Sequence, residues 1–118
     1  MNKREVGSGY ELIAGEYLSK NGVSDLIYNY RTRYGEIDII GRDGDALVFF
    51  EVKYRSKDKM GYAAQAVTYK KQSRICRVSD YYMTTERISY DTQIRYDVIA
   101  IDGDKLDWIK NAFEYIPR

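Results

Sequence analysis

The hydrophobic positions near the N-terminus follow helical spacing. They recur every three or four residues and form one stripe, made by Tyr10, Ile13, Ala14, Tyr17 and Leu18. Ser8 suits the N-cap of this helix and Gly22 can end it, so the pattern predicts a helix from Ser8 to Asn21. A second long helix is predicted further along the chain, where the same spacing relates Ile75, Val78, Ser79, Tyr82 and Met83.

Strand patterns fill most of the remaining sequence. Runs rich in β-branched and aromatic residues, bounded by turn residues, predict strands at 24–31, 35–42, Ala46–Arg55, Gln93–Asp102 and 106–109. The element order is therefore α-β-β-β-α-β-β. A helix between the third and fourth strands indicates a right-handed parallel crossover, whereas the first strands are joined by short turns that suit hairpins. We expect an α/β fold with a mixed sheet flanked by helices.

Length and composition narrow the classes of protein further. The 118 residues suit a single domain spanning 1–118, because no repeat, linker or low-complexity tract divides them. No run approaches the ~20 apolar residues that cross a bilayer and no apolar signal segment follows Met1, so we expect a soluble cytoplasmic protein with no membrane partner. Cys76 is the only cysteine and histidine is absent, which excludes internal disulfides, Cys/His zinc clusters and His-based catalytic triads. Any metal ion must therefore be held by oxygen ligands.

Charged residues interrupt two of the predicted strands. Because side chains alternate between the faces of a strand, Glu36 and Asp38 share one face, while Ile37 and Ile39 take the other. The same rule puts Glu51 and Lys53 on one face of the next strand. If these strands pair through the turn that joins them, Asp38 lies roughly opposite Phe50 or Glu51. The sequence therefore predicts that Asp38, Glu51 and Lys53 converge.

Such a group has the composition of a metal site for phosphate chemistry. Carboxylates from two strands, here Asp38 and Glu51, supply the hard oxygen ligands that Mg²⁺ or Mn²⁺ prefers. A bound ion can stabilise charge on a phosphate and acidify a water molecule, and Lys53 can position that water or neutralise developing charge. On the first helix Glu11 borders the apolar stripe whereas Glu16 points away from it, so Glu11 is the better candidate for a third ligand.

An ordinary cross-strand charge pattern also explains Glu51 and Lys53, since Glu-x-Lys triplets are abundant in exposed strands. The site hypothesis is favoured because this triplet extends a buried run, Val48-Phe49-Phe50, and because two further acids lie on the neighbouring isoleucine-rich strand.

Several motifs occur in an order that marks a known family. They are Gly35-Glu36-Ile37-Asp38, Val48-Phe49-Phe50-Glu51-Val52-Lys53-Tyr54-Arg55, Ala66-Val67-Thr68 with Lys71, and Arg95-Tyr96-Asp97-Val98. On these motifs the chain from Gly9 to Phe113 closely resembles the YraN (UPF0102) family of small bacterial proteins. Its Asp…Glu-x-Lys core also resembles that of the restriction-endonuclease-like superfamily.

The resemblance implies a fold, an activity and a set of site residues. The family is similar in fold to archaeal Holliday-junction resolvases, which implies a restriction-endonuclease-like core and a DNA nuclease activity that depends on Mg²⁺ or Mn²⁺. It implies Asp38 and Glu51 as metal ligands, Lys53 as the catalytic lysine and Glu11 as the acid of the first helix, with Glu36 as an adjacent, secondary candidate.

Gln65 is a further candidate. The segment Gln65-Ala66-Val67-Thr68-Tyr69 resembles the Gln-x-x-x-Tyr element of exonuclease relatives, in which Gln65 would orient the water at the metal or the lysine. A surface amide at the start of a helix explains Gln65 equally well.

Basic residues near these motifs suit a nucleic-acid-binding rim. The net charge is only +1, so any basic surface must be local. The candidates lie near the second strand, after the third strand or on the second helix: Arg31, Arg33, Arg42, Arg55, Lys57, Lys59, Lys70, Lys71, Arg74 and Arg77. Contacts to phosphates predict structure-selective or weakly sequence-dependent binding. We expect DNA rather than RNA as the partner. A solvated helix face is the more common origin of such runs.

Three functions remain open on the sequence. The first is a metal-dependent DNA endonuclease that acts on branched or recombination intermediates, with a homodimer bringing two sites to two strands. The second is a non-catalytic nucleic-acid-binding module of the same fold. The third is an adaptor that binds a protein partner through a tyrosine-rich surface. The tyrosines concerned, which can also stack bases or pack in the core, are Tyr28, Tyr30, Tyr34, Tyr81, Tyr82 and Tyr90.

Overall fold

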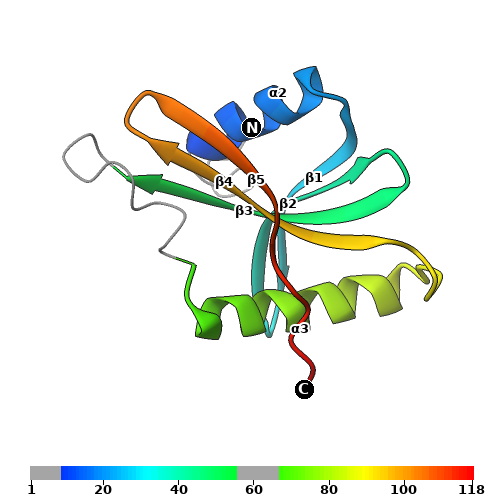
Figure 1. Ribbon diagram of the computed structural model, residues 1–118. Coiled ribbons are helices and arrows are strands. Elements are labelled where there is room, and N and C mark those ends of the chain that lie inside the picture. Colours follow the sequence, from blue (N-terminus) through cyan, green and yellow to red (C-terminus); the bar gives the residue numbers. More distant parts are fainter. Residues whose placement is uncertain (1–8, 56–66) are drawn as a thin grey trace.

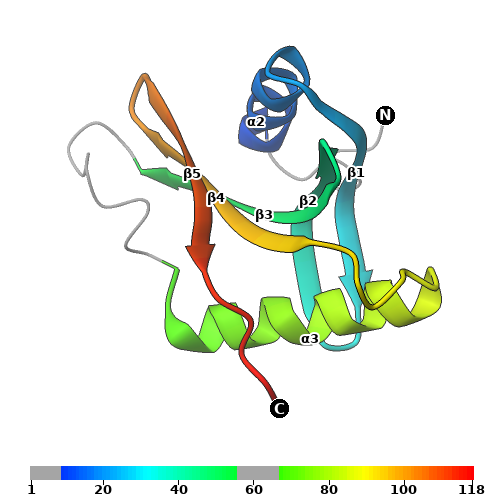
Figure 2. The same ribbon diagram turned by 45° about the vertical axis from the view of Figure 1, so that its right-hand side comes forward.

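The computed structural model describes residues 9–55 and 67–118, which form one mixed sheet with a helix on each side (Figures 1 and 2). The strands are β1 (Val23–Thr32), β2 (Gly35–Asp43), β3 (Ala46–Arg55), β4 (Ile94–Asp102) and β5 (Lys105–Phe113), and the helices are α2 (Gly9–Lys20) and α3 (Tyr69–Thr85). The order α-β-β-β-α-β-β and the α/β class predicted from the sequence are confirmed.

The five strands lie in the sheet in the order in which they occur in the chain. All neighbours are antiparallel except β3 and β4, which are parallel and are connected through α3. This crossover carries α3 across one face of the sheet, while α2 covers the other (Figure 2). Because β3 has a strand on both sides and a helix over each face, it is the natural place for a fully apolar run.

The two faces of the sheet have separate cores. Under α2, Ala14 and Leu18 pack with Val48, Phe50 and other buried residues. Under α3, a second cluster of buried residues includes Ile37, Ile40, Leu47, Phe49, Ile75, Cys76 and Val78. Successive residues of β3 therefore enter opposite cores, which is why its first half is apolar at every position.

The side chains of β2 do not alternate regularly, and here the sequence prediction was wrong. Ile37 and Ile39, expected on one face, belong to different cores, Ile37 to the one under α3 and Ile39 to the one under α2. The neighbouring strand is distorted at the same level, since Asn29 has a positive φ of 54° and lies between residues paired with Ile37 and Ile39. A left-handed backbone is uncommon outside glycine. This irregular part of the sheet is thus centred on Asp38.

The last strand extends beyond the expected 106–109. Its pairing with β4 contains a register shift between Tyr96 and Val98, and Asn111 adopts a φ of 53°. A bulge of this kind absorbs an irregular residue and lets pairing resume, which carries β5 on to Phe113.

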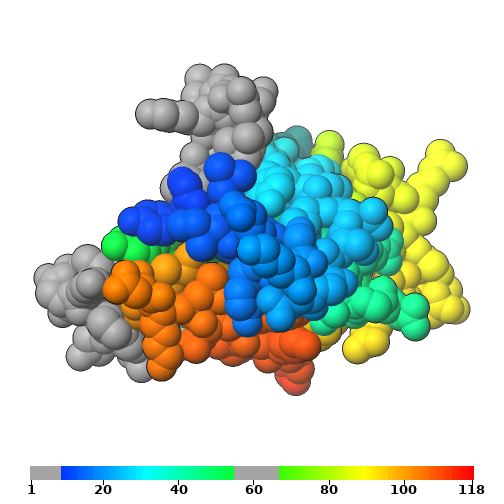
Figure 3. Space-filling view, turned by 90° about the horizontal axis from the view of Figure 1, so that it is seen from above, coloured from blue at the N-terminus to red at the C-terminus, as the bar shows by residue number. Residues whose placement is uncertain are grey.

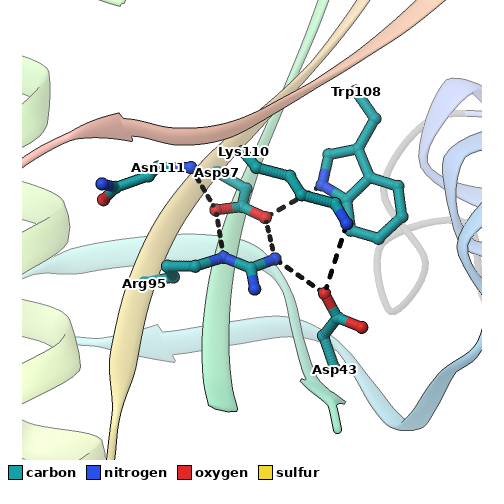
Figure 4. Close-up of polar contacts among 6 residues, drawn as sticks. All are labelled: Asp43, Arg95, Asp97, Trp108, Lys110 and Asn111. Atoms are coloured by element: carbon teal, nitrogen blue, oxygen red, sulfur yellow. Dashed lines mark hydrogen bonds and ion pairs between the residues drawn. The ribbon is translucent and has the colours of Figure 1, made fainter.

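Asp97 holds the bulge together (Figure 4). It is fully buried and accepts hydrogen bonds from both Nε and Nη2 of Arg95, from the indole N–H of Trp108 and from the backbone N–H of Asn111. Arg95 also donates to Asp43 at the end of β2, at 2.9 Å. The Arg95-Tyr96-Asp97-Val98 motif therefore connects β4 to β5 and to the end of β2. Asp97 is buried, so each of its oxygens needs hydrogen-bond partners, and these come from β4 and β5.

Candidate metal and phosphate site

Asp38 lies where β2 and β3 diverge. The paired residues run from Asp43 and Ala46 to Ile39 and Phe50, and the ladder ends there. One step further, the backbone N–H of Val52 donates a hydrogen bond of 2.8 Å to Asp38 Oδ2. The carboxylate thus takes the place of a backbone carbonyl between the strands, which fixes its position relative to β3.

Glu51 is the most buried acid of the site. Its side chain is only 4% exposed, and its Oε2 lies 3.5 Å from Lys53 Nζ and 3.6 Å from Lys71 Nζ. Burial, followed by the charge and contact of Asp38, raises the pKa of Glu51 to about 8, although both lysines act in the opposite direction. Its Oε1 is buried without a hydrogen-bond partner. One carboxylate oxygen, Oε2, therefore has two ammonium partners, whereas the other, Oε1, has no hydrogen-bond partner.

Glu11 reaches the same place from α2. Burial and the adjacent Asp38 raise the pKa of Glu11 to about 8, and a hydrogen bond from Asn29 opposes the shift. Its Oε1, like that of Glu51, is buried without a partner. Glu16 on the same helix is exposed. Of the two helix acids, only Glu11 lies beside Asp38.

The donor set suits a divalent cation bound to oxygen. Carboxylates of α2, β2 and β3 meet, and Glu11 and Glu51, which carry the unsatisfied oxygens, both interact with Asp38 in a setting that disfavours negative charge. A cation would supply the missing partner. Within residues 9–55 and 67–118, however, no three His, Cys, Asp or Glu side chains are already arranged to hold a metal ion. Binding therefore requires the carboxylates to turn toward the ion.

Glu36 lies at the margin of this group. Its Oε2 accepts a hydrogen bond of 3.1 Å from Arg31 Nε, and its charge contributes to the raised pKa of Glu11. Glu36 is thus an electrostatic neighbour of the three carboxylates, and its own partner is Arg31.

The predicted basic residues separate into several groups. Arg33 is exposed beside the ring of Tyr34, and Lys70 and Arg74 are exposed on the first turns of α3. The hairpin between β1 and β2 packs against α3. A Cβ added at Gly35, the first residue of β2, would lie 3.9 Å from the Cβ of Arg74 on α3. These cations therefore share one side of the molecule. Three further predicted residues, Lys57, Lys59 and Gln65, lie outside the described residues, and Arg55 ends β3 with no described side chain.

Arg77 does not belong to a binding rim. It donates to the carbonyl of Ile116 and pairs with Asp80 at 3.5 Å, so it attaches the C-terminal segment to α3.

Most of the singled-out tyrosines pack against one another. Tyr30 meets Tyr82 edge to face at 5.2 Å between ring centroids, and Tyr34 lies 6.4 Å from Tyr81. These two pairs join the β1–β2 hairpin to α3, whereas Tyr28 packs against the core under α2 and Tyr90 is fully exposed.

Two residues of the site escaped sequence reasoning. Asn29 hydrogen-bonds Glu11. The feature of the sequence that could have indicated its role is an asparagine in the middle of a strand, where this residue type is depleted. Lys71 was expected to contact phosphates from a helix face, yet it pairs with Glu51 inside the site. Nothing in helical spacing alone shows which strand residue a lysine on α3 will face.

No helix among the described residues has the length and apolar character needed to cross a membrane.

Comparisons with known proteins all point to one family, and the matches cover almost the whole chain. A family model described as "Uncharacterised protein family UPF0102" matches residues 10–101, a span that includes all the carboxylates and lysines of the site. A UPF0102 protein of Serratia proteamaculans is 45% identical over 114 residues, covering 96% of this chain and 97% of the relative. One of Lachnoclostridium phytofermentans is 42% identical, with 97% of each chain covered, and one of Vibrio cholerae is 40% identical, with 95% and 94% covered. The chain therefore belongs to the UPF0102 family.

Proposed function

We propose that this chain is a metal-dependent nuclease that hydrolyses DNA phosphodiester bonds. The observation that carries the proposal is the grouping of Glu11 and Glu51 around Asp38, whose carboxylate is anchored to the backbone of Val52. Two lysines lie beside Glu51. Buried acids with raised pKa values beside cationic groups are typical of functional sites and costly in purely structural ones.

Each residue has a chemical task in this proposal. Asp38, Glu51 and Glu11 would hold Mg²⁺ or Mn²⁺. A bound ion supplies Lewis acidity toward the phosphate and lowers the pKa of water in the site. Lys53, 3.5 Å from Glu51, is near enough to orient the attacking water or to offset the negative charge that develops on the phosphate. Lys71 offers a second cation to the same phosphate from α3.

The basic side chains outside the site suit backbone recognition. Arg33, Lys70 and Arg74 are exposed on the side where the hairpin meets α3, and phosphate contacts of this kind carry little sequence information. We therefore propose substrate choice by DNA structure, with branched or recombination intermediates as the favoured class, and DNA over RNA as the partner.

The first test is a calorimetric titration with Mn²⁺ and Mg²⁺. Wild type should show saturable binding, and a variant carrying Asp38→Asn and Glu51→Gln should show none. Glu16→Gln, a change of an exposed acid on α2, serves as the matched control. Cleavage of branched, single-stranded and duplex DNA by wild type but not by the double variant completes the test. Absence of metal binding, even with DNA present, would contradict the nuclease proposal.

A second candidate function is a DNA-binding module without turnover. It is favoured by the pairing of Glu51 with both lysines and by the absence of a ready-made cation site in the described ranges. This function predicts DNA binding that persists in a metal chelator and yields no cleavage products.

A further inference from the structure

Two tyrosine rings stack beside the carboxylates. The rings of Tyr10 and Tyr54 are 3.8 Å apart at their centroids and only 15° from parallel. Tyr10 directly precedes Glu11, and Tyr54 directly follows Lys53. In Figure 3 the start of α2, in dark blue, lies against the end of β3, in green. The ring pair thus joins α2 and β3, two of the elements that carry the site.

The two rings differ in exposure. Tyr10 packs against the core under α2, whereas Tyr54 is 38% exposed. The other stacked pairs within the described residues both include Tyr96, which is 3% exposed. Tyr10 and Tyr54 therefore form a stack with one anchored ring and one ring open to solvent.

We propose that the Tyr10–Tyr54 stack is a binding site for one unpaired nucleobase of the DNA substrate. The inference rests on the nuclease function proposed above and specifies its substrate. A flat aromatic ring, held on its inner side by a second ring, offers a face on which a base continues the stack. Any base has such a face, so the contact selects for accessibility and carries no sequence preference.

The position of the stack connects it to the scissile phosphate. Tyr54 lies on the α2 face of β3, as Val52 does, whereas Glu51 and Lys53 alternate to the face of α3, where Glu51 meets Lys71. The stack therefore adjoins the carboxylates from the side of Glu11, whose Cα is about 3.8 Å from that of Tyr10. A nucleotide with its phosphate at the carboxylate and lysine group can bring its own or its neighbour's base to Tyr54, because stacked bases along a strand rise by about 3.4 Å. A base inside a duplex has both faces covered by its neighbours. The site therefore favours a single strand or the unpaired nucleotide at a branch point.

The test measures binding of a fluorescein-labelled single-stranded oligonucleotide by anisotropy, with Ca²⁺ in place of Mg²⁺ so that binding is followed without turnover. Tyr54→Ala should weaken binding roughly tenfold to a hundredfold, and Tyr54→Phe, which keeps the ring, should not. Tyr115→Ala removes an exposed tyrosine of the C-terminal segment and should leave the affinity unchanged. Duplex binding should be the same for all four proteins.

The ligand supplies a control that is independent of folding. Oligonucleotides that each lack one base should reveal one position at which the abasic change weakens binding to wild type, but not to Tyr54→Ala. If no abasic position affects wild type, or if Tyr54→Phe loses as much affinity as Tyr54→Ala, the stack only joins α2 to β3 and the inference is overturned. Manganese calorimetry and cleavage report separately on the nuclease function: base-dependent binding without cleavage would support this site and contradict that activity.

Discussion

Glu51 is subject to opposing electrostatic effects. Two ammonium groups within 3.6 Å favour its ionised form, but burial and the neighbouring Asp38 outweigh them and leave its pKa raised. The protein therefore keeps protons at these carboxylates near neutral pH. Residues that are destabilising until a ligand arrives are common at functional sites and rare elsewhere.

The raised pKa values predict a pH dependence of stability. Glu11 and Glu51 have pKa values of about 8 in the folded chain against 4.5 for the ordinary side chain. Between these pH values the unfolded chain loses protons that the folded chain retains, so the free energy of unfolding should fall as pH rises from 4.5 to 8 and then level off. Glu51→Gln should flatten this fall and be more stable than wild type by about 2 kcal/mol at pH 8, as measured by urea denaturation.

Glu16→Gln provides the matched control for that measurement, because Glu16 is an exposed acid on the helix that carries Glu11. Its stability should follow the wild-type pH curve. A wild-type stability that increases steadily from pH 4.5 to 8 would show that the two acids are ionised in the folded protein.

The two lysines of the site should have separable effects on activity. Lys71→Met removes a cation that lies on α3 and is 38% exposed, so it should raise KM for DNA roughly tenfold and reduce the salt dependence of binding by about one phosphate contact. Lys53→Met should chiefly lower kcat. Steady-state kinetics across salt concentrations distinguish these effects. Lys71→Arg should restore KM, whereas a fall in kcat with unchanged salt dependence would place Lys71 in the chemical step.

At the scale of elements, the Asp97 network joins β4 to β5 and to the end of β2 (Figure 4). Arg95 and Asp97 are both on β4, and the indole and backbone donors come from β5. A buried carboxylate with every oxygen satisfied is structural in character, in contrast to Glu51 with its unsatisfied Oε1.

We expect Asp97→Ala to destabilise the fold by about 3–5 kcal/mol, because it leaves the Arg95 guanidinium and the Trp108 indole partly buried without their acceptor. Urea denaturation would measure the loss. Asp107→Ala, at an exposed position of β5, should change stability little. Since Asp97 is not a proposed ligand, the folded fraction of the Asp97 variant should still bind Mn²⁺, and loss of that binding would assign Asp97 to the metal site.

The elements with regular periodicity could be predicted from the sequence, and the irregular ones could not. Alternation and helical spacing gave the order of elements, and pairing through a short turn brought Asp38 near Glu51. The irregular backbone at Asn29, opposite Asp38, accompanies a break in the alternation on which such predictions depend, so the faces of Ile37 and Ile39 were assigned wrongly. The proximity of Lys71 to Glu51 depends on how α3 lies across the sheet, which no local pattern encodes.

At the scale of the whole molecule, positive charge is concentrated locally. The chain has 19 Lys and Arg against 18 Asp and Glu. Several of the cations are committed to internal ion pairs, among them Arg31, Arg77 and Arg95. The exposed cations of α3 and the hairpin therefore act without support from a net field. Attraction to DNA should be short-ranged and strongly reduced by salt.

Metal binding should be visible as stabilisation of the entire fold. A ligand that binds only the folded state at 100 times its Kd adds about 2.7 kcal/mol, which for a chain of this size raises Tm by roughly ten degrees. Protons compete for Glu11 and Glu51, so the shift caused by a fixed Mn²⁺ concentration should be larger at pH 8 than at pH 6. Differential scanning fluorimetry of wild type and Asp38→Asn at both pH values would measure it. A shift that is equal in the two proteins, or larger at pH 6, would mean that the ion binds elsewhere, because metal uptake by these carboxylates is coupled to proton release in this pH range.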